Sequence, residues 1–368
     1  MIYLDNAATT ARKPIGVYRA LMWETLFHSS NAGRGTHRES LRATEAIINA
    51  QDEIGMLFNI KKPQNIVFTQ NATYALNLAI LGTLGNGGHA IVTQMDHNSV
   101  LRPVYRLGNY TVVNADTDGY VCVKDIERAI RPDTKMIIMS HASNVCGTVQ
   151  NIGAVSQLAK SNGIMFMIDA AQTAGVVPID NEILGADFIA CAGHKGLMGP
   201  LGTGCLYVHS PRKLIPVITG GTGSNSELKE QPRNMPEMLH SGTMNTPAIS
   251  ALAEGVKFVR NHGADEIGAY ESELANELRN RLANMSHVKI YGSPPQIGTV
   301  AFNIKGMGSD EAAAKLTGFA LRAGFHCAPL AHEALKTQKT GAVRASFGYF
   351  NKKSDAVKLA DAIYKIIA

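Results

Sequence analysis

Seven short apolar segments between residues 66 and 209 constrain the fold of this chain more than any other feature. They read IVFT from residue 66, AIVT from 90, TVVNAD from 111, MIIMSH from 136, IMFMID from 164, DFIA from 187 and CLYVH from 205. Amphipathic stretches such as 73–83 and 153–162 separate several of them. This alternation predicts an α/β domain with a mainly parallel sheet, whose functional residues gather in the loops at the carboxyl ends of the strands.

The rest of the chain predicts a second, smaller unit. Residues 219–247 are rich in Gly, Pro and polar residues without a period, which indicates a long loop. Residues 250–284 predict a long helix, and an α+β tail follows with VKIYG, GTVAFNIKG, a helix near 310–323, AVRASFGYF and a helix at 354–367. We therefore expect a large domain over 13–255 and a small α+β domain formed by 1–12 and 256–368.

Charge and cysteine usage exclude several classes of protein. The net charge of +5 is spread without a basic run, which argues against nucleic acid as a partner. Asp5 stands where a signal peptide has its basic and apolar regions, and no apolar stretch approaches about 18 residues, so we expect a cytoplasmic protein without a membrane partner. The five cysteines are widely spaced and lack CxxC, which argues against a disulfide framework and a zinc ribbon.

Three spaced elements carry the strongest chemical signal, namely QNATYALN from residue 70, IMFMIDAAQ from 164 and CAGHKG from 191. Pyridoxal 5'-phosphate requires an amine, a carboxylate that keeps its ring nitrogen protonated, and an anion site for its phosphate. Lys195, Asp169 and the helix start at Ala72 and Thr73 match these needs, because a helix start offers free N–H groups and a favourable dipole. His194 and Thr243 are further candidates for the phosphate.

Each of these residues also has a structural explanation. Asp169 suits a turn at a strand end, and Thr73 suits a helix N-cap. His97, in MDHNSV, follows another strand, where its ring can lie over the cofactor or serve the fold alone. A metal site at His326, Cys327 and His332 lacks further ligands, so no metal is predicted. The joint pattern, rather than any single residue, favours the cofactor site.

Motifs along nearly the whole chain carry a family resemblance. They are LDNAATT near the start, HASNVCGT from 141, DAAQ from 169, GHKG from 193, SGTMNT from 241, RAGFHCAPL from 322 and VRASFGYF from 343. The chain resembles the class V aminotransferase superfamily, in particular its cysteine desulfurase and selenocysteine lyase branch. The resemblance implies the large type I fold of pyridoxal-phosphate enzymes and a homodimer with active sites at the subunit interface.

The resemblance also assigns roles to individual residues. For the cofactor, it implies Lys195 as the Schiff-base lysine, Asp169 as the partner of the ring nitrogen, Gln172 as a contact of the ring oxygen, and His97 as the stacking and proton-transfer residue. For the substrate, it implies that Arg344 binds the carboxylate and that Asn144 contacts either the cofactor or the substrate. Across the subunit interface, it implies that Thr243 contacts the partner subunit's phosphate and that Arg34 enters the neighbouring site. A guanidinium suits a carboxylate because it binds both oxygens at once.

Cys327 decides the reaction within that family. It matches the nucleophile that takes sulfur from L-cysteine, leaving L-alanine and an enzyme persulfide, and His326 or His332 are candidates to assist its deprotonation. A buried structural cysteine is the alternative explanation. The open alternatives for function are a selenocysteine lyase, a class V aminotransferase that does not use Cys327, and a degenerate member that binds cofactor or partner proteins without catalysis.

Three positions depart from the family pattern. Ala192 replaces a serine whose hydroxyl bonds the phosphate, Tyr74 follows the phosphate-helix threonine where many relatives have Glu, and Phe325 precedes His326. The loop around Cys327 is short and contains proline, as in the branch with a compact loop, which often needs a partner protein to accept the sulfur. The 219–242 stretch is long enough for that branch's hook.

Overall fold

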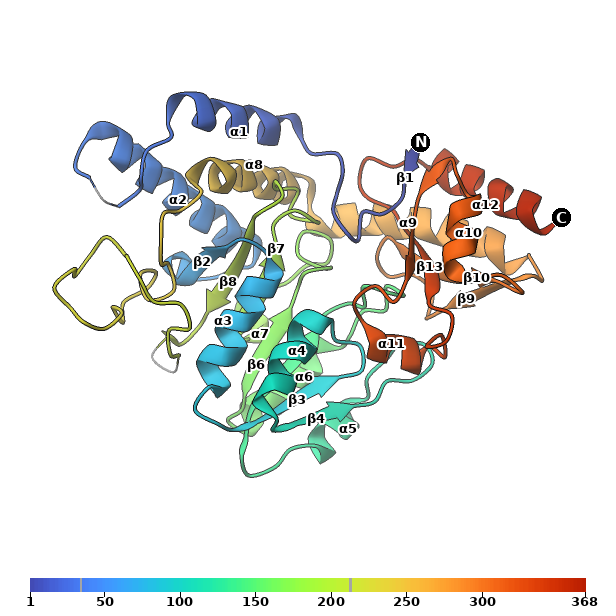
Figure 1. Cartoon of the computed structure of the whole chain (residues 1–368), viewed down its shortest axis with the longest axis horizontal. Helices are drawn as coiled ribbons and strands as arrows, with labels where there is room; N and C mark the ends of the chain where they lie inside the picture. Colours follow the sequence, from blue (N-terminus) through green and yellow to red (C-terminus); the bar gives the residue numbers. More distant parts are fainter. Residues whose placement is uncertain (34, 212–213) are drawn as a thin grey trace.

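The computed structural model describes residues 1–33, 35–211 and 214–368 (Figure 1). Arg34, a predicted substrate contact, lies outside the described residues. A seven-stranded sheet forms the centre of the larger part, in the order β2–β8–β7–β6–β5–β3–β4. Its strands are β2 (Ile66–Thr69), β3 (His89–Thr93), β4 (Tyr110–Val113), β5 (Thr134–Ser140), β6 (Met165–Asp169), β7 (Phe188–Ala192) and β8 (Gly204–Val208). Strand β8 runs in the opposite direction to the other six strands of this sheet.

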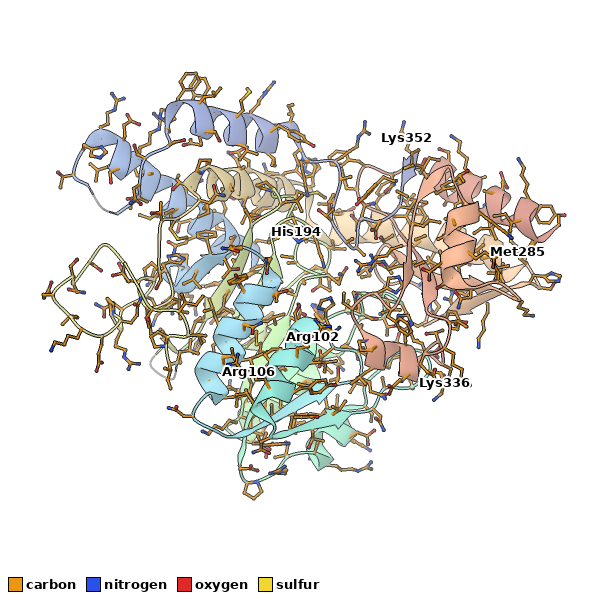
Figure 2. The ribbon with its side chains drawn as sticks, in the orientation of Figure 1. Arg102, Arg106, His194, Met285, Lys336 and Lys352 are labelled. Carbon is orange, nitrogen blue, oxygen red and sulfur yellow. The ribbon has the colours of Figure 1, made fainter. Side chains whose placement is uncertain are left out.

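All seven predicted strands are confirmed, because the sheet is buried on both faces. Consecutive residues of β6 show this directly: Phe166 packs into one hydrophobic cluster, and Met167 packs into another on the opposite face. Both faces therefore need apolar side chains, which produces the uninterrupted apolar runs of the sequence. Side chains fill the space between the sheet and the helices that cover it (Figure 2).

Helices cover both faces of this sheet. They are α1 (Ile15–Phe27), α2 (Arg38–Leu57), α3 (Ala72–Leu84), α4 (Asn98–Leu107), α5 (Val123–Arg128), α6 (Ile152–Ser161), α7 (Asn181–Leu184) and α8 (Thr246–His262), with a short 3₁₀ turn η1 at Pro63–Asn65. Helices α1 and α2 both pack against α8 (Figure 1). Residues 219–245 contain neither helix nor strand, as predicted for the long loop.

The smaller part has its own sheet, in the antiparallel order β12–β13–β10–β9. Its elements are α9 (Ala264–Ala283), β9 (Val288–Tyr291), β10 (Thr299–Ile304), α10 (Ser309–Lys315), β11 (Phe319–Ala320), β12 (Arg322–Gly324), α11 (Pro329–Ala334), β13 (Ala342–Ser346) and α12 (Lys353–Ile367). The N-terminal strand β1 (Ile2–Tyr3) pairs with β11, and Leu4 packs into the hydrophobic cluster of this part. The predicted domain limits themselves stay a prediction.

Two predicted helices differ from the observed ones. The long helix expected over 250–284 is two helices, α8 and α9, because Gly263 between them has a left-handed backbone with φ of 84°. The helix expected near 310–323 ends at Lys315, and the strands β11 and β12 follow it. Among the described residues, no helix is both long and apolar enough to cross a lipid bilayer.

Candidate active site

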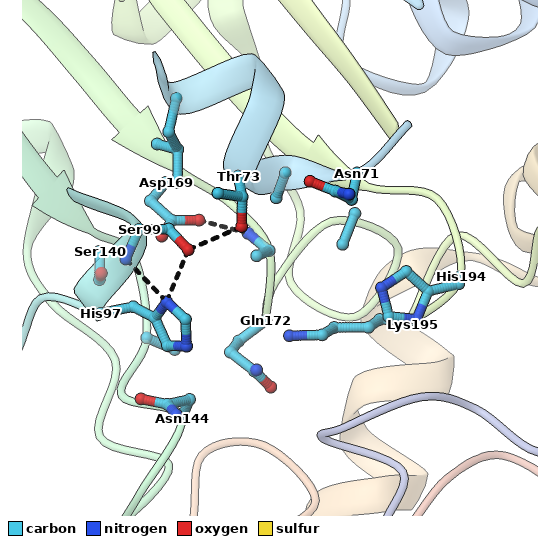
Figure 3. A pocket seen from close by; sticks show the side chains of 15 residues that line it. Asn71, Thr73, His97, Ser99, Ser140, Asn144, Asp169, Gln172, His194 and Lys195 are labelled. Atoms are coloured by element: carbon cyan, nitrogen blue, oxygen red, sulfur yellow. Dashed lines mark hydrogen bonds between the residues drawn. The ribbon is translucent and has the colours of Figure 1, made fainter. Parts of the chain in front are cut away.

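A cavity of about 100 Å³ opens at the carboxyl ends of the central strands (Figure 3). The starts of two helices and the loops after three strands line it, with the residues Asn71, Ala72, Thr73, Leu76, His97, Ser99, Ser140, Ala142, Asn144, Asp169, Ala171, Gln172, Ala192, His194 and Lys195. Eight residues predicted to bind the cofactor or to act on the substrate therefore meet in one place. The prediction that functional residues gather at this edge of the sheet agrees with this position.

Lys195 extends into the cavity from the side opposite His97 (Figure 3). Burial lowers the pKa of its amine to about 8, and the charges of Arg344 and Arg322 act in the same direction, whereas the negative charge of Asp169 opposes them. The loop that carries it is fixed from the N-terminus: the Thr10 hydroxyl donates to the Lys195 carbonyl at 2.9 Å, and Lys13 Nζ donates to the His194 carbonyl at 2.7 Å. A readily deprotonated amine is thereby held in a fixed position.

Asp169 is the last residue of β6 and is buried. Its Oδ1 accepts the Ala171 N–H at 2.9 Å. Burial raises the pKa of this carboxyl, while that N–H and the charge of Lys195 lower it. Within the described part of the chain, Oδ2 has no hydrogen-bond partner, so one carboxylate oxygen is available to a group in the cavity.

The start of α3 forms an anion cradle. Asn71 is the N-cap, and its side chain accepts the N–H of Tyr74 at 3.1 Å. The alternative explanation of Thr73 as the N-cap is therefore wrong. Because the first N–H groups of a helix have no partner within it, those of Ala72 and Thr73 remain free to bind an anion. Strand β8 approaches this turn closely at Gly204, where an added Cβ would lie 2.7 Å from the Asn71 backbone.

His97 is the N-cap of α4 and belongs to a chain of hydrogen bonds. Its Nδ1 lies 3.1 Å from the Ser99 nitrogen and 2.9 Å from the Ser99 hydroxyl, which in turn lies 2.8 Å from the Thr73 hydroxyl. Burial, together with the charges of Lys195, Arg322, Arg102 and Arg344, lowers the pKa of His97 to about 4. The imidazole is therefore neutral at pH about 7.

Three further lining residues connect the cavity to its surroundings. Gln172 Nε2 donates to the Ala7 carbonyl at 3.1 Å, and Asn144 Nδ2 donates to the His326 carbonyl at 2.7 Å. His194 has a lowered pKa of about 4, mainly because of burial, and its buried Nδ1 has no partner among the described residues. An unpartnered nitrogen at the cavity is what a site for a polar group leaves when that group is absent.

The loop that carries Cys327 lies against the start of α4. The Asn98 N–H donates to the Cys327 carbonyl at 2.8 Å, and both His326 and Cys327 have left-handed backbones, with φ of 50° and 56°. The thiol itself is exposed, and Arg322 Nη2 donates to its sulfur at 3.8 Å. The thiol therefore lies beside the cavity but does not line it.

The histidines expected to assist Cys327 are engaged elsewhere. His326 Nδ1 and His332 Nε2 are 3.3 Å apart, and His332 Nδ1 lies 2.7 Å from the Thr337 hydroxyl. Burial lowers the pKa of His326 to about 3 and that of His332 to about 4. Among the described residues, no group of three or more His, Cys, Asp or Glu side chains has the arrangement of a metal site.

Two further predicted site residues, besides Cys327, do not line the cavity. Arg344 is only 1% exposed; its Nη2 donates to Asp5 Oδ1 at 2.6 Å, its Nη1 donates to the Asn144 carbonyl at 2.8 Å, and its Nε is buried without a partner in the described chain. Thr243 lines a different cavity, together with Tyr74 and Gly204. The role of Arg344 toward a carboxylate and the role of Thr243 toward a partner subunit's phosphate stay predictions.

Some residues that shape the site were not predicted from the sequence. Ser99 and Asp96 flank His97 in MDHNSV, and Asp5 belongs to LDNAATT. Asp96 is fully buried, accepts the N–H groups of Thr93 and Ser140 at 2.6 Å each, and thereby joins the ends of β3 and β5 before His97. Burial raises its pKa to about 6. The sequence signal that could have identified Asp96 and Ser99 is that both are polar residues within two positions of His97.

The donor set fits pyridoxal phosphate. An amine, a carboxylate with a free oxygen and two free N–H groups at a helix start converge on one cavity, and these are the groups that the cofactor requires. The orphaned Nδ1 of His194 adds a polar atom in the same place. The missing hydroxyl at Ala192 leaves one donor fewer for the phosphate, but it does not remove the cradle.

Known proteins resemble this chain over its whole length. A family model described as class V aminotransferase matches residues 2–359. A probable cysteine desulfurase of Methanothermobacter thermautotrophicus is 32% identical, with 99% of this chain and 94% of that protein covered. The apo structure of a cysteine desulfurase from Thermococcus onnurineus NA1 has a TM-score of 0.93 at 29% identity, with 100% of this chain and 94% of that chain covered.

A cysteine desulfurase structure from Escherichia coli has a TM-score of 0.88 at 26% identity and covers 99% of this chain and 94% of that chain. These structures confirm the predicted type I fold with its mainly parallel central sheet. The match of the family model over nearly every residue confirms the predicted resemblance, and the chain belongs to the class V aminotransferase family.

Proposed function

We propose that this chain is a pyridoxal-phosphate-dependent cysteine desulfurase that converts L-cysteine to L-alanine and carries the sulfur on Cys327 as a persulfide. One observation carries the proposal: the Asn98 N–H donates a hydrogen bond to the Cys327 carbonyl. Asn98 follows His97, which lines the same cavity as Lys195 and Asp169, so the contact holds the Cys327 loop beside that cavity. The names of the relatives at about 30% identity give independent support.

The cofactor would be held by residues of three segments, namely the end of β6 with the loop after it, the loop after β7 and the start of α3. Lys195 Nζ would bind its aldehyde carbon, Asp169 Oδ2 its ring nitrogen, Gln172 its ring oxygen, and the N–H groups of Ala72 and Thr73 its phosphate. His194 Nδ1 would add a polar contact. When bound, the cofactor supplies an electron sink for the bonds of the substrate α-carbon.

The chain's own residues would bind the substrate and move its protons. As a free amine, Lys195 would have the pKa needed to take the α-proton and return it near neutral pH. Asn144 lines the cavity. Its backbone carbonyl accepts a hydrogen bond from Arg344 Nη1, so Arg344 lies next to the residue that lines the cavity. The substrate carboxylate would share the Arg344 guanidinium with Asp5, because Asp5 already holds Nη2.

Cys327 would take the sulfur. Its sulfur, which accepts a hydrogen bond from Arg322 Nη2 at 3.8 Å, would give up its proton and form a bond to the substrate sulfur as the bond between that sulfur and the β-carbon breaks. The electron pair of the broken bond stays with the carbon fragment, which is protonated to alanine. L-cysteine and the enzyme thiol thus give L-alanine and the enzyme persulfide, without any outside oxidant or reductant.

The test uses the exposed cysteines as a matched pair. The enzyme loaded with cofactor is given L-cysteine and dithiothreitol, and alanine and sulfide are measured in parallel. Cys327→Ala should form neither product, whereas Cys122→Ala, which removes the other exposed thiol, should match the wild type. Undiminished product formation by Cys327→Ala would overturn the role of this thiol. A strict need for a keto acid acceptor would instead indicate an aminotransferase.

We also propose that the chain forms a homodimer. Helix α1 exposes Ile15, Met22, Trp23, Leu26 and Phe27 by 53% to 66% each, an apolar surface that water disfavours. A second copy of the chain is its proposed occupant, in line with the expected interface site and the partner role of Thr243. Sedimentation should give twice the chain mass of 39.4 kDa, and the double variant Trp23→Glu, Leu26→Glu should give a monomer. A monomeric wild type contradicts the proposal.

A partner protein that accepts the sulfur and a cytoplasmic location complete the proposal. The exposure of the Cys327 thiol supports the first, because an acceptor can reach it from solution. The five free cysteines support a reducing compartment. Sulfur transfer from Cys327 to an added acceptor protein, followed with labelled cysteine, and cell fractionation are the respective tests.

A further inference from the structure

The starts of α3 and α4 meet inside the cavity, and two hydroxyl groups join them. Thr73 is the second residue of α3, Ser99 is the second residue of α4, and their oxygens are 2.8 Å apart (Figure 3). The Thr73 hydroxyl thus holds the Ser99 side chain on the side of His97. Ser99 is the only connection between the anion cradle and the imidazole among the hydrogen bonds of the described residues.

Ser99 makes two contacts to the same nitrogen of His97. Its backbone N–H points to Nδ1 at 3.1 Å, and its hydroxyl lies 2.9 Å from Nδ1. A backbone N–H can only donate, so Nδ1 must present its lone pair and carries no proton. In a neutral imidazole the proton then resides on Nε2. The N-cap of α4 therefore dictates the tautomer of His97.

The surroundings of His97 disfavour a second proton. Cationic groups act on it from four elements: Lys195 from the loop after β7, Arg102 from α4 (Figure 2), Arg322 from β12 and Arg344 from β13. The neighbouring carboxylate of Asp96 is occupied by N–H groups of Thr93 and Ser140. The imidazole thus stays neutral, in agreement with its lowered pKa of about 4.

We propose that Ser99 is a positioning residue that holds His97 as the neutral tautomer with its proton on Nε2, so that His97 donates a hydrogen bond in the cavity while Lys195 carries the protons. The second half rests on the proposed function. Nε2 already holds a proton and cannot take one from a substrate. Protonation at Nδ1 would require loss of the cap of α4. The proton-transfer role predicted for His97 is thereby assigned to Lys195.

The tautomer is measured on the cofactor-free protein, so this test does not depend on activity. Long-range ¹⁵N–¹H spectra of histidine-labelled protein distinguish the two ring nitrogens, and His97→Gln assigns the signals. We expect an unprotonated Nδ1 and a protonated Nε2 across pH of about 6 to 8, where an ordinary histidine titrates. A protonated Nδ1, as the other tautomer or as imidazolium, would overturn the proposal.

Variants of Ser99 test the part played by its hydroxyl. Ser99→Ala removes the hydroxyl but keeps the backbone N–H, so Nδ1 should stay unprotonated while the resonances of the two ring nitrogens shift, whereas Ser99→Thr should restore the wild-type resonances. Ser161→Ala is the control, because that hydroxyl only bonds the Gln157 carbonyl of its own helix. A Ser99→Ala spectrum identical to the wild type would refute the role of the side chain.

The proton carrier is tested on the loaded enzyme by exchange of the alanine α-hydrogen in D₂O. Glutamine can donate a hydrogen bond but cannot carry a proton, so His97→Gln should keep exchange within about tenfold of the wild type, and His97→Phe should lose more. Lys195→Ala should abolish exchange. Loss in His97→Gln as complete as in Lys195→Ala would make His97 the proton carrier. Failure of the wild type to bind cofactor would overturn the proposed function and the role of Lys195, while leaving the tautomer result standing.

Discussion

Asp5 and Arg344, which are 339 positions apart in the chain, form an ion pair with 2.6 Å between Oδ1 and Nη2. Arg344 is almost fully buried in the middle of β13, an inner strand of the small sheet, and Asp5 follows the N-terminal strand β1. The N-terminal segment therefore supplies the charge that makes a buried guanidinium tolerable next to the candidate site. Its second partner, the Asn144 carbonyl, links the pair to the cavity.

Removal of Asp5 should destabilise the fold. Asp5→Ala leaves the buried charge of Arg344 without its partner, which typically lowers the free energy of unfolding by about 3 to 5 kcal/mol. Urea unfolding followed by circular dichroism measures the change. Glu182→Ala breaks the exposed pair with Lys61 and should cost less than about 1 kcal/mol. Equal effects of the two substitutions would contradict the argument.

The pH dependence of cofactor capture should follow Lys195. The neutral amine is the reactive form, and burial lowers its pKa from the ordinary value of 10.5 to about 8. Capture by the cofactor-free protein, followed by absorbance, should therefore accelerate as pH rises and level off above about 8. Since the charge of Asp169 raises this pKa, Asp169→Asn should move the midpoint to lower pH. A midpoint near the ordinary value, or a shift upward in the variant, would refute this.

Lys195→Ala should be inactive while it remains folded. Loss of the group that moves protons typically lowers a rate by about 10² to 10⁴-fold, and the covalent link to the cofactor is lost as well. Alanine formation from L-cysteine and the cofactor absorbance should both fall, whereas the far-ultraviolet circular dichroism should not change. Lys61→Ala, at an exposed position, serves as the control. A variant that retains covalent cofactor would identify another lysine as the attachment site.

Asn71→Ala should weaken cofactor affinity through the helix start. The cap it removes is worth about 1 kcal/mol, and without it the first turn of α3 no longer holds the N–H groups of Ala72 and Thr73 in place. Asn151→Ala removes an equivalent N-cap from α6, where the side chain accepts the Ala154 N–H at 3.1 Å. Both variants should lose similar stability, and only Asn71→Ala should raise the cofactor Kd. Similar Kd values for the two would contradict the cradle.

The central sheet was predictable because its signal is local. The inner strands are buried on both faces, so every residue of a run such as MFMI in β6 must be apolar, and neighbours in sequence carry the whole pattern. The break between α8 and α9 was not predictable from periodicity, because the apolar pattern continues across Gly263 while the backbone there turns left-handed. A single glycine does not interrupt an amphipathic pattern, but its φ ends the helix.

The candidate site was predictable only in part. Lys195, Asp169 and Thr73 stand at strand ends or helix starts, so their convergence follows from the sheet topology. Ser99 and Asp5 were not predicted. Ser99 is important because of its hydrogen bond to Thr73, and Asp5 because of its ion pair with Arg344, and both contacts form only in the folded chain. Thr243 was expected to contact the phosphate of a partner subunit, and it lies in another cavity of this chain. A contact between two subunits cannot be seen in a single chain.

His326 and Cys327 both have a left-handed backbone conformation, so the turn that carries the thiol is strained. A non-glycine residue in this backbone conformation is less stable by roughly 1 to 2 kcal/mol, and both His326 and Cys327 adopt it. Glycine relieves that strain because it lacks a Cβ. Cys327→Gly should therefore unfold at higher urea than Cys327→Ala, although both lack the sulfur. At this turn the residue that suits the backbone and the residue that suits the chemistry are different ones.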